Sequence, residues 1–125
     1  MIETTAGIGG AVDFYRRGLF IVDEDPETDI ILIQMAVDVY GGHSPDLPKS
    51  LASTTDTLCE VCSAIKKPLA VAFFTGGHAD TLLAVLSARE KLTKLGVPVF
   101  TGVGSASKSI DKVITFNQIS YSDVN

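Results

Sequence analysis

The amino-acid sequence predicts an α/β protein with helices on both faces of a parallel sheet. Three apolar runs lack polar alternation, as is typical of strands buried on both faces, at 29–37, 67–74 and 97–102. Helical patterns separate them, and strand–helix–strand units of this length form parallel sheets with right-handed connections. At 125 residues, 46% hydrophobic and 20% charged, the chain is expected to form a single domain over 1–125.

The N-terminal segment combines a weak strand pattern at 2–6 with a glycine-rich turn and a predicted helix over 11–23. The apolar residues that fit one face of this helix are Val12, Tyr15, Leu19 and Ile21. The turn contains Gly7, Gly9 and Gly10. These glycines serve either a tight turn that needs positive φ or an anion that approaches the N–H groups of the helix N-terminus.

The centre of the chain holds an acidic run and a second helix. The run contains Asp23, Glu24, Asp25, Glu27 and Asp29. Because they sit on one connection, we interpret them as a solvated turn and expect no metal site. Ser44, Pro45 and Asp46 signal the start of a helix over about 46–66.

The second helix has a regular buried stripe, formed by Leu51, Leu58, Val61, Cys62 and Ile65. Cys59 and Cys62 form a Cys-x-x-Cys pair near the end of this helix. Reactive pairs of this kind stand at a helix N-terminus, where the dipole lowers a thiol pKa. We therefore interpret the two cysteines as structural.

The clearest helical pattern covers 79–95, with Gly96 as its C-cap. Its residues expected to face inward are Leu82, Leu83, Val85, Leu86, Leu92 and Leu95. A final helix is predicted over 105–120 from the spacing of Ser105, Ile110, Val113, Ile114 and Tyr121.

Two Gly-Gly-His sequences follow the ends of predicted strands. His43 follows Gly41 and Gly42, and His78 follows Gly76 and Gly77. Open α/β sheets bind ligands beyond the carboxyl ends of their strands, where glycines let backbone N–H groups reach an anion. Gly76 and Gly77 are therefore candidates for phosphate binding, and His78 is the stronger of the two histidines for a chemical role.

Composition and motifs exclude several classes of protein. The net charge of −5 disfavours nucleic-acid binding. No apolar run approaches the ~18 residues of a transmembrane helix. Two cysteines and no recognisable signal peptide favour the cytoplasm. A phosphoacceptor strand of the receiver type would need an aspartate where Gln34 stands, and common nucleotide-binding loops are absent.

Several segments together are similar to a known family. "AGIGGAVDFYRRGLFIVDEDPETDIILIQM", "KKPLAVAFFTGG" and "AREKLTKLGVPVFTGVGSASKSI" resemble the flavodoxin-like, succinyl-CoA synthetase-like domain of NDP-forming acyl-CoA synthetases. The likeness covers most of 6–121. It implies a three-layer αβα, flavodoxin-like fold whose first strand and helix are missing from this chain, so that a strand edge is open to another chain.

The resemblance implies a function that this domain performs with others. Family members join a carboxylic acid to CoA through an acyl phosphate and a phosphohistidine, at the expense of ATP or another nucleoside triphosphate. A CoA-binding Rossmann domain and an ATP-grasp domain are the implied partners, and CoA and ATP/ADP belong to the complete enzyme. His78 is the phosphohistidine candidate, with Gly7, Gly9, Gly10, Gly76 and Gly77 around the phosphate.

The chain departs from the family's His-Ala-Gly pattern because Asp80 follows Ala79. We therefore expect the isolated domain to be inactive and to hold no stable phosphate on His78. The alternative function is a non-catalytic flavodoxin-like module for binding or oligomerisation. Without the usual first strand, the 29–37 strand must pair with 2–6 or with another chain. We expect a homo-oligomer, because a long apolar strand edge is a poor surface to leave in water.

Overall fold

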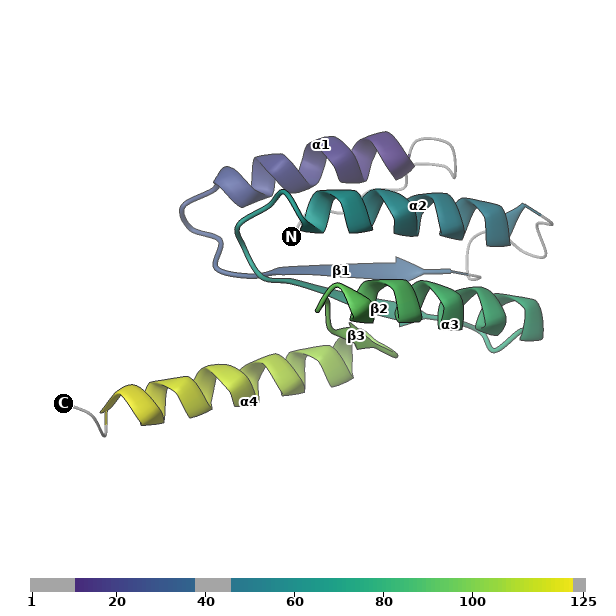
Figure 1. The fold of residues 1–125 in the computed structure, drawn as a ribbon. Coiled ribbons are helices and arrows are strands. Elements are labelled where there is room, and N and C mark those ends of the chain that lie inside the picture. The colour runs from purple at the N-terminus through teal and green to yellow at the C-terminus, as the bar shows by residue number, and fades with distance from the viewer. Residues whose placement is uncertain (1–10, 38–45, 123–125) are drawn as a thin grey trace.

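The computed structural model describes residues 11–37 and 46–122, and its fold is mixed α/β. Within these ranges, four helices surround a three-stranded parallel sheet (Figure 1). The elements, in chain order, are α1 (Ala11–Glu24), β1 (Ile31–Ala36), α2 (Leu47–Cys62), β2 (Leu69–Phe74), α3 (Ala79–Lys94), β3 (Val99–Phe100) and α4 (Val103–Ser122).

The three strands lie in the order β1-β2-β3, and both pairs are parallel. This confirms the three adjacent parallel strands predicted from the apolar runs. β1 pairs with β2 along its whole length, from Ile31 opposite Leu69 to Ala36 opposite Phe74. β3 has only two residues, so the predicted strand at 97–102 is too long. The possible strand at 2–6 lies outside the described residues.

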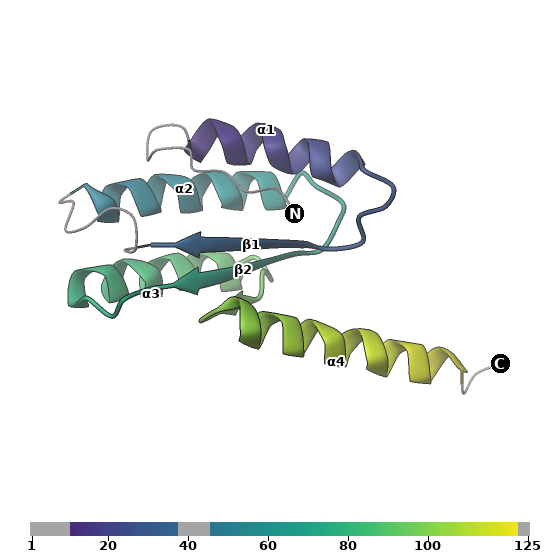
Figure 2. The ribbon, with the colours of Figure 1, turned by 180° about the vertical axis from the view of Figure 1, so that it is seen from behind.

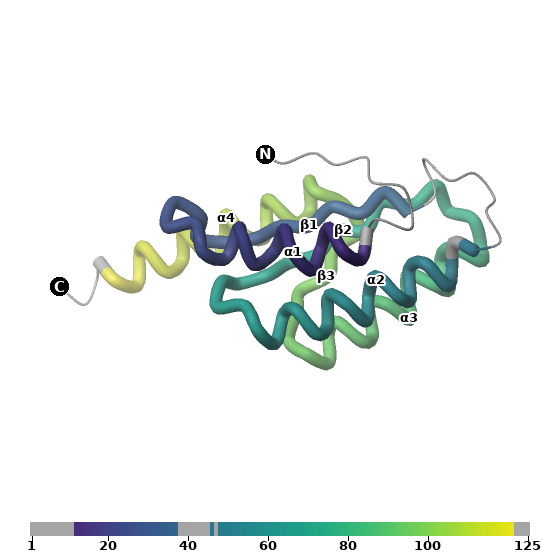
Figure 3. Tube along the Cα trace, turned by 90° about the horizontal axis from the view of Figure 1, so that it is seen from above, coloured from purple at the N-terminus to yellow at the C-terminus, as the bar shows by residue number. Residues whose placement is uncertain are grey.

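One face of the sheet carries the hydrophobic core. Alternate residues of β1 and β2 point to this face and are buried: Ile31, Ile33, Leu69, Val71 and Phe73. α2 adds Leu51, Leu58 and Val61, which confirms its predicted stripe. α3 packs beside α2, and α1 packs on the far side of α2 (Figure 3).

The opposite face of the sheet is covered only in part. Ala70 and Ala72 of β2 are buried there, and α4 packs on β2 and β3 with Ala106 fully buried. On β1, however, Gln34 is exposed, while Leu32 and Ala36 are half-buried. Burial on both faces, as expected from the apolar runs, therefore holds for β2 and fails for β1.

The predicted inward face of α3 is largely wrong. Leu92 is buried, and Val85 packs against the core, but the other four leucines are exposed: Leu82, Leu83, Leu86 and Leu95. The buried residues are instead Thr81, Ala88 and Leu92, with Ala84 packed beside them. Small residues at this spacing let α3 approach α2 closely, and this turns the leucines away from the core.

The end of α3 follows its prediction closely. The N–H of Gly96 donates to the carbonyl of Thr93 at 3.0 Å, and the N–H of Val97 donates to that of Leu92 at 3.1 Å. This is the Schellman pattern, in which the glycine adopts positive φ. Gly96 does so, at φ +80°, and Val97 after it is buried.

The helices at the two ends of the chain also bury less than their patterns predict. In α1, Leu19 is buried and Val22 packs on the core, but Ile21 is 69% exposed. In α4, Ile110 is half-buried, whereas Val113, Ile114 and Tyr121 are exposed. Within the described ranges, no helix has both the length and the apolar character needed to cross a membrane.

Candidate functional site

Three of the predicted site residues, Gly76, Gly77 and His78, lie at the carboxyl edge of the sheet. Because the three strands are parallel, their carboxyl ends lie at one edge, and the helix that follows each of β2 and β3 begins there. α1 also begins at this end of the molecule (Figure 1). Helix N-termini with their partial positive charge are thus collected at one edge.

The connection from β2 to α3 is Thr75-Gly76-Gly77-His78. The N–H of Gly77 donates to Oγ1 of Thr75 at 3.0 Å, and this closes a tight turn. Gly77 has φ +90°, a backbone conformation that residues other than glycine rarely adopt. The geometry of the turn is therefore sufficient to explain why a glycine stands at position 77.

His78 is the N-cap residue of α3. Its backbone is extended, at φ −65° and ψ 137°, and its carbonyl accepts the N–H of Leu82 at 2.9 Å. The imidazole makes no capping hydrogen bond, and the residue is exposed. An imidazole in this place stands next to the first-turn amides of α3, which have no acceptor within the helix.

Two charges near this turn have opposite effects on a bound anion. The N-terminus of α3 favours an anion, and a phosphoryl group on or near His78 would meet that field. Asp80 lies in the first turn of the same helix and already satisfies the dipole in part. Its carboxylate would also repel a phosphate.

Other predicted site residues cannot be placed relative to His78. Gly7, Gly9, Gly10 and the Gly-Gly-His sequence ending at His43 lie outside the described residues. At the carboxyl end of the sheet the structure places the turn Gly76–His78 with the N-terminus of α3, and, on the other side of α2, the N-terminal end of α1.

The acidic run forms a turn at the opposite, amino edge of the sheet. The carboxylate of Asp25 accepts the N–H of Glu27 and the hydroxyl of Thr28, each at 3.0 Å. The hydrogen bond from the N–H of Glu27 is the main cause of the lowered pKa of the Asp25 carboxyl. The run therefore acts as a turn, and among the described residues no group of three or more histidines, cysteines or acids could hold a metal ion.

Two residues that sequence reasoning missed connect α1 to β2. The carboxylate of Asp23 accepts the backbone N–H groups of Lys66 and Lys67, with the closest N···O distance 2.8 Å. In return, Nζ of Lys67 donates to the carbonyls of Val22 at 3.2 Å and Asp23 at 2.6 Å, and also to that of Asp25. A lysine ammonium placed on the last carbonyls of a helix caps it and complements its dipole.

The two cysteines lie near the C-terminal end of α2 and are not bonded to each other. Sγ of Cys62 donates to the carbonyl of Cys59 at 3.2 Å. Burial is the main cause that raises the pKa of the Cys59 thiol. Because thiolate is the reactive form, a raised pKa disfavours redox chemistry here and supports the structural interpretation.

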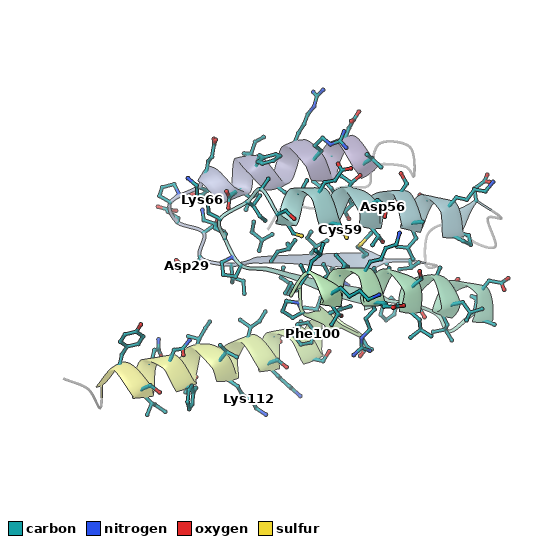
Figure 4. All side chains as sticks on the ribbon, viewed as in Figure 1. Asp29, Asp56, Cys59, Lys66, Phe100 and Lys112 are labelled. Atoms are coloured by element: carbon teal, nitrogen blue, oxygen red, sulfur yellow. The ribbon has the colours of Figure 1, made fainter. Side chains whose placement is uncertain are left out.

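Cys59 also lies close to a charged pair that joins two helices. Nζ of Lys91 on α3 is 2.8 Å from the carboxylate of Asp56 on α2, and Figure 4 shows Asp56 and Cys59 on the same helix above α3. A shallow pocket of about 220 Å³ lies between these helices, lined by Pro48, Ala52, Thr55, Ala84, Ser87, Ala88 and Lys91. It is smaller than the ~300–1,000 Å³ usual for ligand pockets.

Comparison with known proteins adds no family to this description. No protein-family model, curated protein or solved structure matches the chain.

Proposed function

We propose that the chain is a flavodoxin-like domain of an NDP-forming acyl-CoA synthetase and works with CoA-binding and ATP-grasp partner domains. The observation that carries the proposal is the position of His78. It is an exposed imidazole at the N-terminus of α3, on the carboxyl edge of a parallel sheet. An anion carried by this imidazole would lie against the helix N-terminus.

The order of the strands supports the flavodoxin-like part of the proposal. In the order 2-1-3-4-5, the last three strands form the only run of three that is consecutive in sequence and adjacent in the sheet. β1, β2 and β3 are related in this way, with α1, α2 and α3 in one layer and α4 against the other face. On this correspondence, strands 1 and 2 of that order would lie beyond the edge of β1 that no described strand occupies.

The roles of the residues follow from the resemblance in sequence. In such enzymes the imidazole attacks the terminal phosphoryl group of the nucleoside triphosphate, and the nucleoside diphosphate leaves. The phosphoryl group then passes to the carboxylate of the acid, and the CoA thiolate displaces phosphate from the acyl phosphate. His78 would carry the phosphoryl group, with Gly76 and Gly77, and Gly7, Gly9 and Gly10 before α1, giving it room. CoA and nucleotide would be bound by the partner domains.

A second candidate function is a non-catalytic module for binding or oligomerisation. It is favoured by the apolar surface that the described residues leave exposed, which is largest on α3 and α4. Asp80, which stands where the family's pattern has glycine, also favours it, because a carboxylate beside a phosphohistidine opposes the added charge.

Formation of acyl-CoA separates the two candidates. The chain is purified under native conditions with the proteins it retains and is incubated with CoA, a panel of short carboxylic acids, and ATP or GTP. The ligase proposal predicts that acyl-CoA and nucleoside diphosphate form in equal amounts, and that His78→Ala abolishes both. If a preparation that retains its partners makes no acyl-CoA with any acid, the ligase proposal is wrong and the module stands.

A further inference from the structure

The second half of α4 has an unusual composition for a helix on a protein surface. Residues 111–121 are all exposed, and 113–121 contain no charged residue. Five of these nine residues are large and apolar, and their exposed fractions range from 47% to 75%: Val113, Ile114, Phe116, Ile119 and Tyr121. In Figure 1 this part of the helix extends past the sheet, away from the other elements.

The apolar residues point to more than one side of the helix. Successive residues are turned by about 100°. Val113, Ile114 and Tyr121 therefore continue the stripe that begins at Ala106 and Ile110 against the sheet, whereas Phe116 and Ile119 lie on another side. A helix that is apolar on several sides is typical of one that is buried. Its neighbours in the working protein must then cover it from at least two directions.

A second incompletely covered surface is the back of β1, the side of that strand that faces away from α2. On the face of the sheet that α4 shares, Leu32 and Ala36 of β1 are half-buried, and Gln34 is exposed. Figure 2, seen from behind, shows that α4 lies below β2.

We infer that α4 and the back of β1 form a dimer interface with a second copy of this chain. In a two-fold arrangement, α4 of each copy lies beside α4 of its partner and over the back of the partner's β1. A two-fold interface must be self-complementary, and this chain supplies both halves: a helix that needs covering from two sides and a sheet surface that lacks a helix. The inference does not depend on the proposed acyl-CoA synthetase activity.

Area and charge both agree with a second copy as the occupant. Phe116 and Tyr121 are 69% and 75% exposed, which corresponds to roughly 300 Å² between them at about 200 Å² per aromatic side chain. With the three aliphatic residues and the back of β1, the surface approaches the ~800 Å² per partner of a standard interface. Because 113–121 carry no charge, two copies with a net charge of −5 can meet here without repulsion at the contact.

Sedimentation equilibrium of the full chain, from sub-micromolar to 100-micromolar concentration, tests the inference. We expect a monomer–dimer equilibrium, and we expect Val113→Glu/Phe116→Glu to raise the dimer Kd by at least ~100-fold. The matched control is Leu83→Glu/Leu86→Glu on α3. It places the same two charges at the same spacing on exposed residues, and it should leave the Kd within about three-fold of the original.

Two further results would overturn the inference. A wild-type chain that is monomeric at all these concentrations has no such interface. A dimer that survives the α4 substitutions, or that dissociates only with the α3 pair, is formed by another surface. Hydrogen exchange gives a readout independent of the substitutions: amide protection in 113–121 should rise with protein concentration, and protection that is already present in the dilute monomer would show that this chain covers its own helix. Circular dichroism of each variant verifies the fold.

Discussion

Single residues show most clearly how the turns of this chain are held. Lys67 ties the last carbonyls of α1 to the strand that begins two residues later, and Asp23 binds the backbone of the same segment from the other side. The two residues are 44 positions apart. They therefore fix where α1 lies relative to β2, a relation that no local pattern in the sequence specifies.

We predict that Lys67→Met destabilises the fold by about 1.5–3 kcal/mol, the range for hydrogen bonds that involve a charged group. Methionine keeps the apolar stem and removes only the ammonium, so lost packing contributes little. Urea unfolding followed by circular dichroism measures the change. Lys66→Met is the control, because the side chain of Lys66 is exposed and only its backbone N–H binds Asp23. Equal effects of the two substitutions would contradict the role given to the Lys67 ammonium.

Neither Lys67 nor Asp23 could have been selected from the sequence. A lysine before a proline and an aspartate in an acidic run are common, and only the folded chain shows that they bind each other's backbone. The acidic run was interpreted correctly as a turn, because Asp-Pro-Glu-Thr carries its own hydrogen-bonding geometry within four residues. Residue-level prediction thus worked where the cause is local.

At the scale of whole elements, α3 shows that the pattern of apolar residues in the sequence does not determine which side of a helix packs on the core. Leucines make up half of its apolar residues, yet the side that meets α2 is built from Thr81, Ala84 and Ala88. The sequence correctly predicted that a helix exists here and that Gly96 ends it. It could not show which of two apolar sides faces the core, because that depends on how closely the neighbouring helix approaches.

Leucine-to-alanine substitutions at two positions in α3 test which side of this helix faces the core. Leu92→Ala removes a fully buried side chain and should cost about 2–5 kcal/mol of unfolding free energy. Leu83→Ala removes one that is 68% exposed and should change it by less than about 0.5 kcal/mol. Both are measured by chemical denaturation. If the two substitutions lowered the unfolding free energy by similar amounts, Leu83 would face the core, as the leucine pattern predicted.

For the whole molecule, the sequence predicted the class of fold and the direction of the strands. Continuous apolar runs and intervening helices were sufficient for this, since right-handed strand–helix–strand units have few alternative arrangements. What the sequence could not show is that, among the described residues, one face of β1 is covered only in part and the second half of α4 is exposed. Both depend on what lies beside the elements rather than on their own residues.

The candidate site was predictable in the same limited sense. The position of His78 follows from two local facts, the end of an apolar strand and the start of a helical pattern, and the structure places it at the N-terminus of α3. The second half of the predicted site, before α1 and after β1, lies outside the described residues. Chemistry on His78 itself therefore tests the site.

Phosphate transfer to His78 tests the central claim most directly. The chain, purified under native conditions with its retained partners, is given γ-³²P-labelled ATP, and acid-labile, base-stable label on the chain is counted. We predict that His78→Ala removes the label and that His43→Ala, which alters the other histidine, keeps it. Label that persists in His78→Ala, or a fully partnered chain that takes up none, would contradict the phosphohistidine account.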